Sequence, residues 1–333
     1  VAGAGAGAGP GPGSGSRVLQ EPDEPDVRVA AVEDGRSAEA TLDADGFALA
    51  RMEEGAAAAG RLLRSGEVAS PRAVVDAMYA RVEELVCKTA GASRVLVFDH
   101  IFRDAKRLRA EDQAGVKRGD PTATPFLQGY ATQVHNDYTV RSGRTRAQQL
   151  LAPYEPEDRI QTLLDGARYG ILNVWWPLAN ADACPLALCR WRSAMPGDVR
   201  TVRLVYQHRV GEIYRVHHSS QHEWVYYPGM TADEAIVFKV FDSSDSVARF
   251  ALHAAFEPPA ASDDACAGSA GGAAGEASSS SRISLEFRCL VFWGDVPDFA
   301  GGFEAPHLRP GSADADSRVS LVRREVLPVS SAW

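Results

Sequence analysis

Residues 133–139 have the sequence Gln-Val-His-Asn-Asp-Tyr-Thr, and this stretch is the most informative one for the fold of the chain. His135 and Asp137 are separated by one residue, and on a β-strand two such side chains point to the same face. Both could therefore reach one metal ion. His253 follows much later in the chain. If it enters from another strand, the three side chains form a 2-His-1-carboxylate set, which binds iron on one face and leaves positions open for O₂ and a co-substrate.

The composition is that of a globular protein with one large domain or two ordinary ones. The chain has 333 residues, of which 45% are hydrophobic and 24% charged, enough to bury a substantial core. The net charge of −9 argues against nucleic acid and anionic membrane surfaces as partners. No apolar run approaches the roughly 20 residues of a membrane-spanning helix. We expect a cytoplasmic protein. Because the sequence begins at Val1, it leaves undecided whether a targeting segment lies upstream. The oligomeric state is also undecided.

The cysteines predict reduced thiols and no disulfide scaffold. Their number is odd, and no two are spaced as Cys-x-x-Cys, which also argues against a zinc finger. The five are Cys87, Cys184, Cys189, Cys266 and Cys289.

Two low-complexity segments interrupt the globular pattern. Residues 1–26 are rich in Ala, Gly, Pro and Ser and run into an acidic stretch, and residues 261–281 are rich in Ser, Gly and Ala. Such compositions bury too little apolar area to offset the entropy lost on ordering. We expect a disordered tail at 1–26, one domain over 27–333 with a surface loop at 261–281, and activity that needs neither segment.

Helical periodicity is confined to the upstream part of the domain. Apolar residues recur at helical spacing between residues 55 and 90, where Ser70 and Pro71 form a typical helix start. Short β-rich runs follow, separated by Gly, Pro and Asp. They lie at 94–98, 170–175, 199–202, 235–240 and 283–292. Many short strands with flanking helices indicate a mainly β fold, a sandwich or barrel braced on one face.

The run that starts at Ile283 has one polar face. Arg282, Ser284, Glu286 and Arg288 alternate with Ile283, Leu285, Phe287 and Cys289. The polar side chains could face water, as in many antiparallel sheets. Alternatively they line the mouth of a barrel, where Arg282 and Ser284 would bind a dicarboxylate, because an Arg fork pairs with a carboxylate through two bonds. Arg288 lies on the same face and is the alternative anchor.

Seven segments, in order, resemble one family. They are 88–99, 134–139, 172–178, 184–189, 237–243, 249–256 and 282–288. Over residues 35–295 the chain resembles the AsaB-like hydroxylase/desaturase proteins, which include gibberellin desaturase-like enzymes and proteins of cephamycin methoxylation.

The resemblance implies a double-stranded β-helix, a jelly-roll or cupin-like barrel, and Fe(II)/2-oxoglutarate-dependent hydroxylation or desaturation of a secondary-metabolite-like small molecule with O₂. It implies that His135, Asp137 and His253 correspond to the metal motif of the family. It carries the Arg-x-Ser that binds 2-oxoglutarate onto Arg282 and Ser284.

Two other functions stay open at this point. A cupin-like metalloenzyme without redox chemistry could use the same three metal ligands, and a non-catalytic barrel could act as a binding protein. His217, His218 and His222 are interpreted as surface-loop or pocket residues, because the strand-like Trp224-Val225-Tyr226-Tyr227 follows them. The aromatic residues Trp175, Trp176, Trp224, Tyr226 and Tyr227 are core or pocket candidates.

Overall fold

The computed structural model describes residues 26–37, 39–52, 58, 71–116, 127–206, 210–258, 281–296 and 321–326. The predicted tail at 1–26 and loop at 261–281 lie outside these residues, apart from Asp26 and Ser281.

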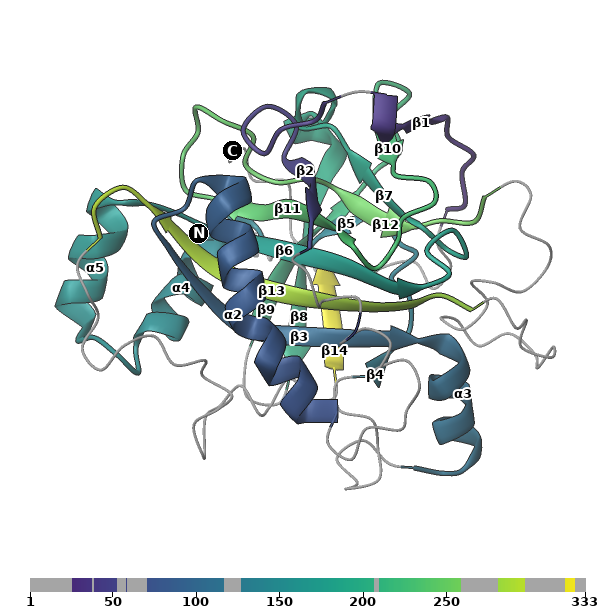
Figure 1. The fold of residues 1–333 in the computed structure, drawn as a ribbon. Coiled ribbons are helices and arrows are strands. Elements are labelled where there is room, and N and C mark those ends of the chain that lie inside the picture. The colour runs from purple at the N-terminus through teal and green to yellow at the C-terminus, as the bar shows by residue number, and fades with distance from the viewer. Residues whose placement is uncertain are drawn as a thin grey trace, which may run out of the picture.

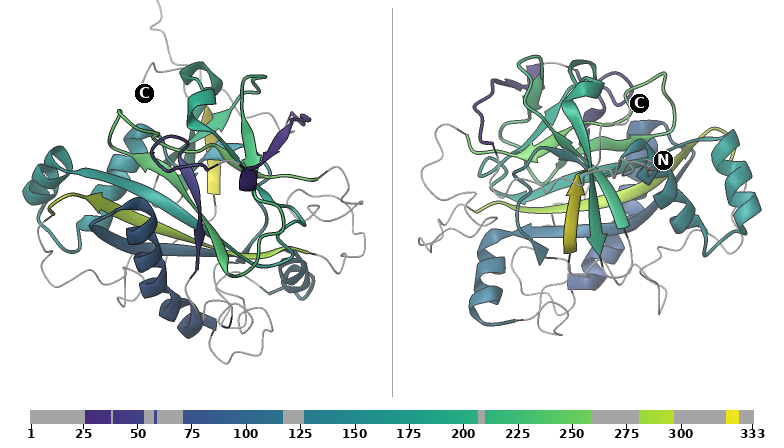
Figure 2. Two further views of the ribbon diagram at one scale, coloured as in Figure 1. Left: turned by 45° about the horizontal axis from the view of Figure 1, so that its top comes forward. Right: turned by 180° about the vertical axis from the view of Figure 1, so that it is seen from behind.

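Two β-sheets form the body of the fold (Figure 1). The eight-stranded sheet has the order β1 (Val32–Asp34), β10 (Trp224–Tyr226), β7 (Leu186–Cys189), β12 (His253–Ala255), β5 (His135–Asn136), β9 (Val210–Val216), β8 (Val199–Tyr206) and β14 (Leu321–Val326). The six-stranded sheet has the order β2 (Phe47–Arg51), β11 (Glu234–Asp242), β6 (Arg168–Ala179), β13 (Ile283–Trp293), β3 (Arg94–Asp104) and β4 (Leu127–Gln128). Neighbouring strands are antiparallel except β1 with β10 and β3 with β4. Figure 2 shows β8, β9 and β14 side by side in the view from behind.

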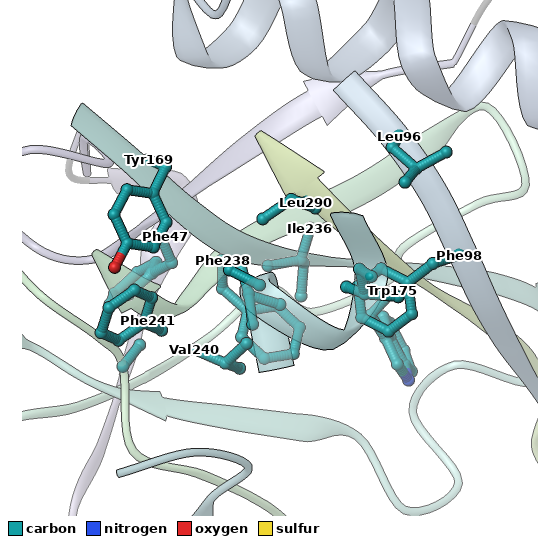
Figure 3. Packing of buried hydrophobic residues seen from close by; sticks show 14 of the residues in the cluster. Phe47, Leu96, Phe98, Tyr169, Trp175, Ile236, Phe238, Val240, Phe241 and Leu290 are labelled. Carbon is teal, nitrogen blue, oxygen red and sulfur yellow. The ribbon is translucent and has the colours of Figure 1, made fainter. Parts of the chain in front are cut away.

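The sheets pack on each other through a shared apolar core. Phe47, Phe98, Trp175, Phe238 and Leu290 come from five strands of the six-stranded sheet and belong to one buried cluster. Leu188 and Val225 of the other sheet join the same cluster. Figure 3 shows Phe47, Phe98, Trp175, Phe238 and Leu290 within this cluster. The predicted mainly β fold, a double-stranded β-helix of jelly-roll type, is confirmed.

Helix α2 (Pro71–Ala90) covers the outer face of the six-stranded sheet (Figure 1). Its Met78, Val82 and Val86 are buried and share a second cluster with Phe287 and Val291 of β13. The helix predicted from the apolar spacing is thus confirmed over Pro71–Ala90, while the earlier part of that run, apart from Ala58, lies outside the described residues. No helix among the described residues is long and apolar enough to cross a membrane.

The five predicted β-rich runs all lie within strands, but the strands are longer than these runs. The run at 94–98 extends to Asp104 in β3, and the run at 170–175 extends over Arg168–Ala179 in β6. The added residues include Asp99 and Arg103, whose polar side chains argue against a buried strand when read alone. They are accommodated because they pair inside the barrel, Asp99 with Arg288 and Arg103 with Glu286.

The remaining helices were not predicted. They are α3 (Ala105–Gln113), α4 (Val140–Leu151), α5 (Glu157–Gly166) and the short 3₁₀ turns Gly35–Ser37, Trp191–Ser193 and Pro196–Asp198. Helix α4 begins directly after the His135 stretch, where Thr139 and Ser142 form a reciprocal capping box. Its Gly143 lies against the ring of Phe241 on β11.

One of the cysteine predictions is wrong. Cys184 is disulfide-bonded, whereas Cys87, Cys189 and Cys289 are free. Sequence spacing could not reveal this bond, because disulfide pairing depends on which Cα atoms the fold brings close together. Cys184 also adopts a left-handed backbone conformation with φ of 71°.

Candidate active site

The two predicted histidine ligands are cross-strand neighbours. In the antiparallel pair of β5 and β12, His253 lies directly opposite His135. Directly opposed side chains in such a pair share one face of the sheet at close range. The two imidazole ring centres are accordingly 4.4 Å apart.

Asp137 reaches the same place by a different route from the expected one. Strand β5 ends at Asn136, so Asp137 lies in the bend that follows and not on the strand. The buried Asn136 side chain fixes this bend, because its Nδ2 donates to the carbonyls of Tyr138 and Val240 at 2.6 and 2.9 Å. The bend places Asp137 Oδ1 3.5 Å from His135 Nε2.

The three residues form a candidate metal site. One ligand atom from each of His135, Asp137 and His253 lies within 4.8 Å of the others, and no other group of three His, Cys, Asp or Glu side chains in the described residues meets this condition. Two nitrogen donors and one carboxylate oxygen suit a divalent transition metal.

Backbone carbonyls orient both imidazoles. His135 Nδ1 is 2.8 Å from the carbonyl of Gln133, and His253 Nδ1 is 3.0 Å from the carbonyl of Ala251. A carbonyl only accepts, so in the neutral form of each imidazole Nδ1 carries the proton and Nε2 has the lone pair that could bind a metal. The ring of Phe238 packs edge-to-face on the imidazole of His253, with the two ring centres 4.7 Å apart, and further fixes its position. Metal-ligating histidines are commonly held by such hydrogen bonds on the other ring nitrogen.

The charge states of these groups also suit a metal. Burial, together with the nearby His135, lowers the pKa of His253 to about 3, so its imidazole is neutral. Burial alone would raise the pKa of Asp137, but the charge of Arg288 and the contact with His135 outweigh it and hold that pKa well below the ordinary value. A neutral imidazole and an ionised carboxylate are the forms that ligate.

A pocket adjoins this centre, and Arg282 forms part of its wall. Besides the two histidines it is lined by Arg103, Ala131, Trp175, Leu186, Ala255, Arg282 and Glu286. The guanidinium of Arg282 lies over the rings of Tyr130 and Trp175, 4.3 and 5.3 Å from their centres. It donates to the carbonyl of Cys184.

Arg282 is a buried cation without a carboxylate partner among the residues that the structure describes. It is 1% exposed, its Nε has no hydrogen-bond partner, and no ion pair joins it to a carboxylate within the described part of the chain. Burial lowers the pKa of Arg282 to about 9. A buried charge is expensive unless it is paired, so this arrangement favours an anionic ligand. The hydroxyl of Ser284 is also buried and without a partner among these residues.

Arg288, the alternative anchor, is already paired. Its guanidinium nitrogens lie 3.0 Å from Asp99 Oδ2, 3.4 Å from Asp137 Oδ2 and 3.7 Å from Glu286 Oε1. The polar face of β13 is therefore turned into the barrel and not into water. Arg282 faces the pocket, and Arg288 faces the metal-site carboxylate.

Sequence reasoning missed Asn173 and Arg103. Asn173 is fully buried and donates to Asp137 Oδ2 at 3.0 Å. A signal was present, since Asn173 interrupts the apolar run of β6. Arg103 lies at the end of β3, where nothing in the sequence marks it as a pocket residue.

The other sequence candidates have structural roles. His217 and His218 are exposed, as the surface-loop interpretation expects. The side chain of His222 is instead buried, with its Nε2 3.1 Å from Asp198 Oδ2. Trp175 lines the pocket, whereas Trp176 points to the opposite face and donates its indole N–H to Ala232. Trp224, Tyr226 and Tyr227 do not line the pocket.

Comparison with known proteins identifies the family. A family model described as "Oxidoreductase/YMDC permease-like domain" matches residues 13–292. Hydroxylase/desaturase efuI of Hormonema carpetanum is 30% identical over 243 residues, covering 67% of this chain and 72% of that protein. The chain belongs to the hydroxylase/desaturase oxidoreductases. A hydroxylase/desaturase of Cercospora beticola is 31% identical, covering 65% of this chain and 63% of that protein. The predicted resemblance is confirmed.

Further relatives of this hydroxylase/desaturase chain name the enzyme class. The Fe(II)/2-oxoglutarate-dependent dioxygenase nvfI of Aspergillus novofumigatus is 27% identical over 67% of this chain and 68% of that protein. A solved structure of the iron and alpha-ketoglutarate-dependent endoperoxidase NvfI superposes with a TM-score of 0.59 at 22% identity, covering 79% of this chain and 85% of that one, and shows the fold. The predicted class, a 2-oxoglutarate-dependent oxygenase, is confirmed.

Proposed function

We propose that this chain hydroxylates or desaturates a secondary-metabolite-like small molecule. Fe(II) is held by His135, Asp137 and His253, and 2-oxoglutarate is anchored by Arg282 with help from Ser284. One observation carries the proposal: His135 and His253 of the three-ligand cluster line the same pocket as a buried arginine that has no carboxylate partner among the described residues.

The residues fit both groups. Two Nε2 lone pairs and one ionised carboxylate are a suitable donor set for Fe(II). The unpartnered Nε of Arg282 and hydroxyl of Ser284 are donors for an anion. A dicarboxylate that reaches from the metal to Arg282 would neutralise a charge that no carboxylate of the described residues pairs with.

When bound, iron and 2-oxoglutarate supply the activation of O₂ needed to remove hydrogen from an unactivated C–H bond. The chain supplies position. The carbonyls of Gln133 and Ala251 hold the two imidazoles, and the guanidinium of Arg282 orients the co-substrate through its distal carboxylate. Trp175, Leu186 and Ala255 form an apolar part of the wall that limits the access of water to the reacting atoms.

The small-molecule substrate enters the same pocket, where Arg103 and Glu286 add polar groups to the wall. The two side chains lie 3.8 Å apart and so hold each other in place. They are candidates for hydrogen bonding to a polar group of the substrate, while the aliphatic residues contact its hydrocarbon. A cytoplasmic location remains a prediction.

The experiment is a product analysis. The purified protein is incubated with Fe(II), 2-oxoglutarate, O₂ and a panel of secondary metabolites, and products are identified by mass spectrometry. Hydroxylation adds the mass of one oxygen atom, and desaturation removes that of two hydrogens. Succinate formation that rises with one compound, together with either mass change, supports the proposal. Substrate turnover that proceeds equally without 2-oxoglutarate contradicts it.

A further inference from the structure

Two side chains hold the oxygen of Asp137 that faces away from His135. Asn173 Nδ2 donates to Asp137 Oδ2 at 3.0 Å, and Arg288 lies 3.4 Å from the same oxygen. The other oxygen, Oδ1, lies 3.5 Å from His135 Nε2 and so faces the metal site. The two oxygens of this carboxylate therefore have different environments.

We infer that Asn173 and Arg288 are positioning residues that restrict Asp137 to one-oxygen ligation and so keep a metal position open for the co-substrate. This inference rests on the proposed function, because it concerns the metal site assigned there. We refer to Asn173 and Arg288 together as the Asp137 clamp.

The sheet fixes both members of the clamp. Asn173 of β6 lies directly opposite Arg288 of β13, and both point into the barrel toward Asp137. On its other side Arg288 lies opposite Asp99 of β3, whose carboxylate accepts a hydrogen bond from it at 3.0 Å. Glu286 accepts from Asn173 at 3.4 Å. The donors are thus held in place by the six-stranded sheet, independently of any metal.

A carboxylate can ligate a metal through one oxygen or through both. A metal held by three protein atoms would keep its remaining positions for a chelating co-substrate and O₂. A second bond from Asp137 would occupy one of these positions. Hydrogen bonds to an ionised acceptor are roughly twice as strong as neutral ones. The hydrogen bond from Asn173 to Oδ2, together with the positive charge of Arg288 3.4 Å from the same oxygen, therefore opposes that second bond.

The clamp makes a prediction that distinguishes it from a general structural role. In Asn173→Ala, Arg288→Met and the double variant, Asp137 is free to ligate through both oxygens. Metal affinity should then stay within a few-fold of the parent value, while the affinity of a chelating ligand for the metal-loaded protein falls. Replacing a hydrogen-bond partner of a metal ligand commonly lowers metal affinity or activity 10- to 100-fold. Because the clamp acts on the open metal position, we expect the affinity for the chelating ligand to fall about tenfold in each single variant and further in the double variant.

The test uses Co(II) as the metal and oxalate as the chelator, with metal-free protein as the starting point. Co(II) affinity is titrated by its visible absorption, whose intensity also reports the coordination number. Oxalate affinity is then measured by calorimetry on the loaded protein. Oxalate has no distal carboxylate, so it cannot make the contact with Arg282 that anchors the far end of 2-oxoglutarate. Losses of oxalate binding are then assigned to the metal and not to the anchor.

Two variants guard against a trivial result. Arg168→Met removes another arginine with two carboxylate partners, Asp43 and Asp242, at the far end of β6. It should lower stability without changing oxalate affinity. Arg288→Lys keeps the charge and should retain part of the oxalate affinity, even if Arg288→Met folds poorly.

The outcomes separate the two proposals. If clamp variants bind oxalate as tightly as the parent, or lose Co(II) and oxalate affinity in parallel, the clamp is contradicted while the metal site stands. If the parent does not bind Co(II), or His253→Ala binds it equally well, the proposed function is contradicted and the clamp with it.

Discussion

His253 lies directly opposite His135 in the antiparallel pair of β5 and β12, with the ring centres 4.4 Å apart. The register of two very short strands therefore decides whether two metal ligands meet. A slip of one residue would turn one histidine to the other face of the sheet. Strand β12 is held on its other side by β7, where His253 lies opposite Leu188. The site is thus largely formed by the fold before any metal binds.

Loss of any one ligand should abolish tight metal binding. In His135→Ala, Asp137→Ala and His253→Ala we expect Fe(II) content to fall to background, because two remaining ligands do not hold a divalent metal well. The far-ultraviolet circular dichroism should change little, since the sheets do not depend on the metal. Metal content of purified variants checks this. His218→Ala, at an exposed position, is the control and should retain the full metal content. Full iron occupancy in the Asp137 variant would refute the ligand assignment.

Removal of Arg282 should weaken 2-oxoglutarate binding and spare the metal. A charge-assisted, partly buried pair is worth on the order of 2–5 kcal/mol, which is roughly a 30-fold or greater loss of affinity in Arg282→Ala. Calorimetry on anaerobic, metal-loaded protein measures it. Ser284→Ala should cost less, because a neutral hydrogen bond contributes about 1 kcal/mol. Arg288→Ala should also have the smaller effect, and a larger effect there would move the anchor to Arg288.

Arg282 should lower the stability of the folded protein when no co-substrate is bound. Arg282 is 1% exposed and has no carboxylate partner among the described residues, so the folded state bears its desolvation cost. Arg282→Met should therefore raise the free energy of unfolding, by about 1–4 kcal/mol. Urea denaturation without ligand tests this. Saturating 2-oxoglutarate should stabilise only the metal-loaded parent. A variant that is less stable than the parent would show that Arg282 has a structural role.

The packing of α4 on β11 should not tolerate a methyl group at Gly143. A Cβ there would lie 2.3 Å from the Phe241 ring, which is buried by its own neighbours. We expect Gly143→Ala to lower the free energy of unfolding by about 1–3 kcal/mol through overpacking. Gly166→Ala is the matched control, because nothing lies within 4 Å of a Cβ at that position in α5. Chemical denaturation of both variants gives the comparison, and equal stabilities would show that α4 shifts freely.

The sequence predicted the features that depend on local pattern. Side-chain chemistry selected His135, Asp137 and His253, which the structure brings together. Apolar spacing located α2, and the alternation of residue types predicted one polar and one apolar face for β13. These signals survive because each is set by residues close together in the chain, or by residue types that few other roles require.

Features that depend on tertiary contacts were not predictable in the same way. The bend that carries Asp137 requires the hydrogen bond from Asn136 to Val240 on a distant strand. The proposed role of Asn173 in positioning Asp137 depends on Arg288, which lies directly opposite it on the neighbouring strand. Whether the polar face of β13 met water or the barrel interior depended on the partner carboxylates, which no alternation pattern contains.

Formation of succinate from 2-oxoglutarate in the absence of any substrate tests the proposed metal and co-substrate chemistry most directly. Many turnovers are not needed, because a slow uncoupled reaction suffices. We expect the parent protein to form succinate only when Fe(II) and O₂ are both present, and His253→Ala to form none. Succinate formation that is absent from the iron-loaded parent, or equal in His253→Ala, would contradict an iron- and 2-oxoglutarate-dependent centre at His135, Asp137 and His253.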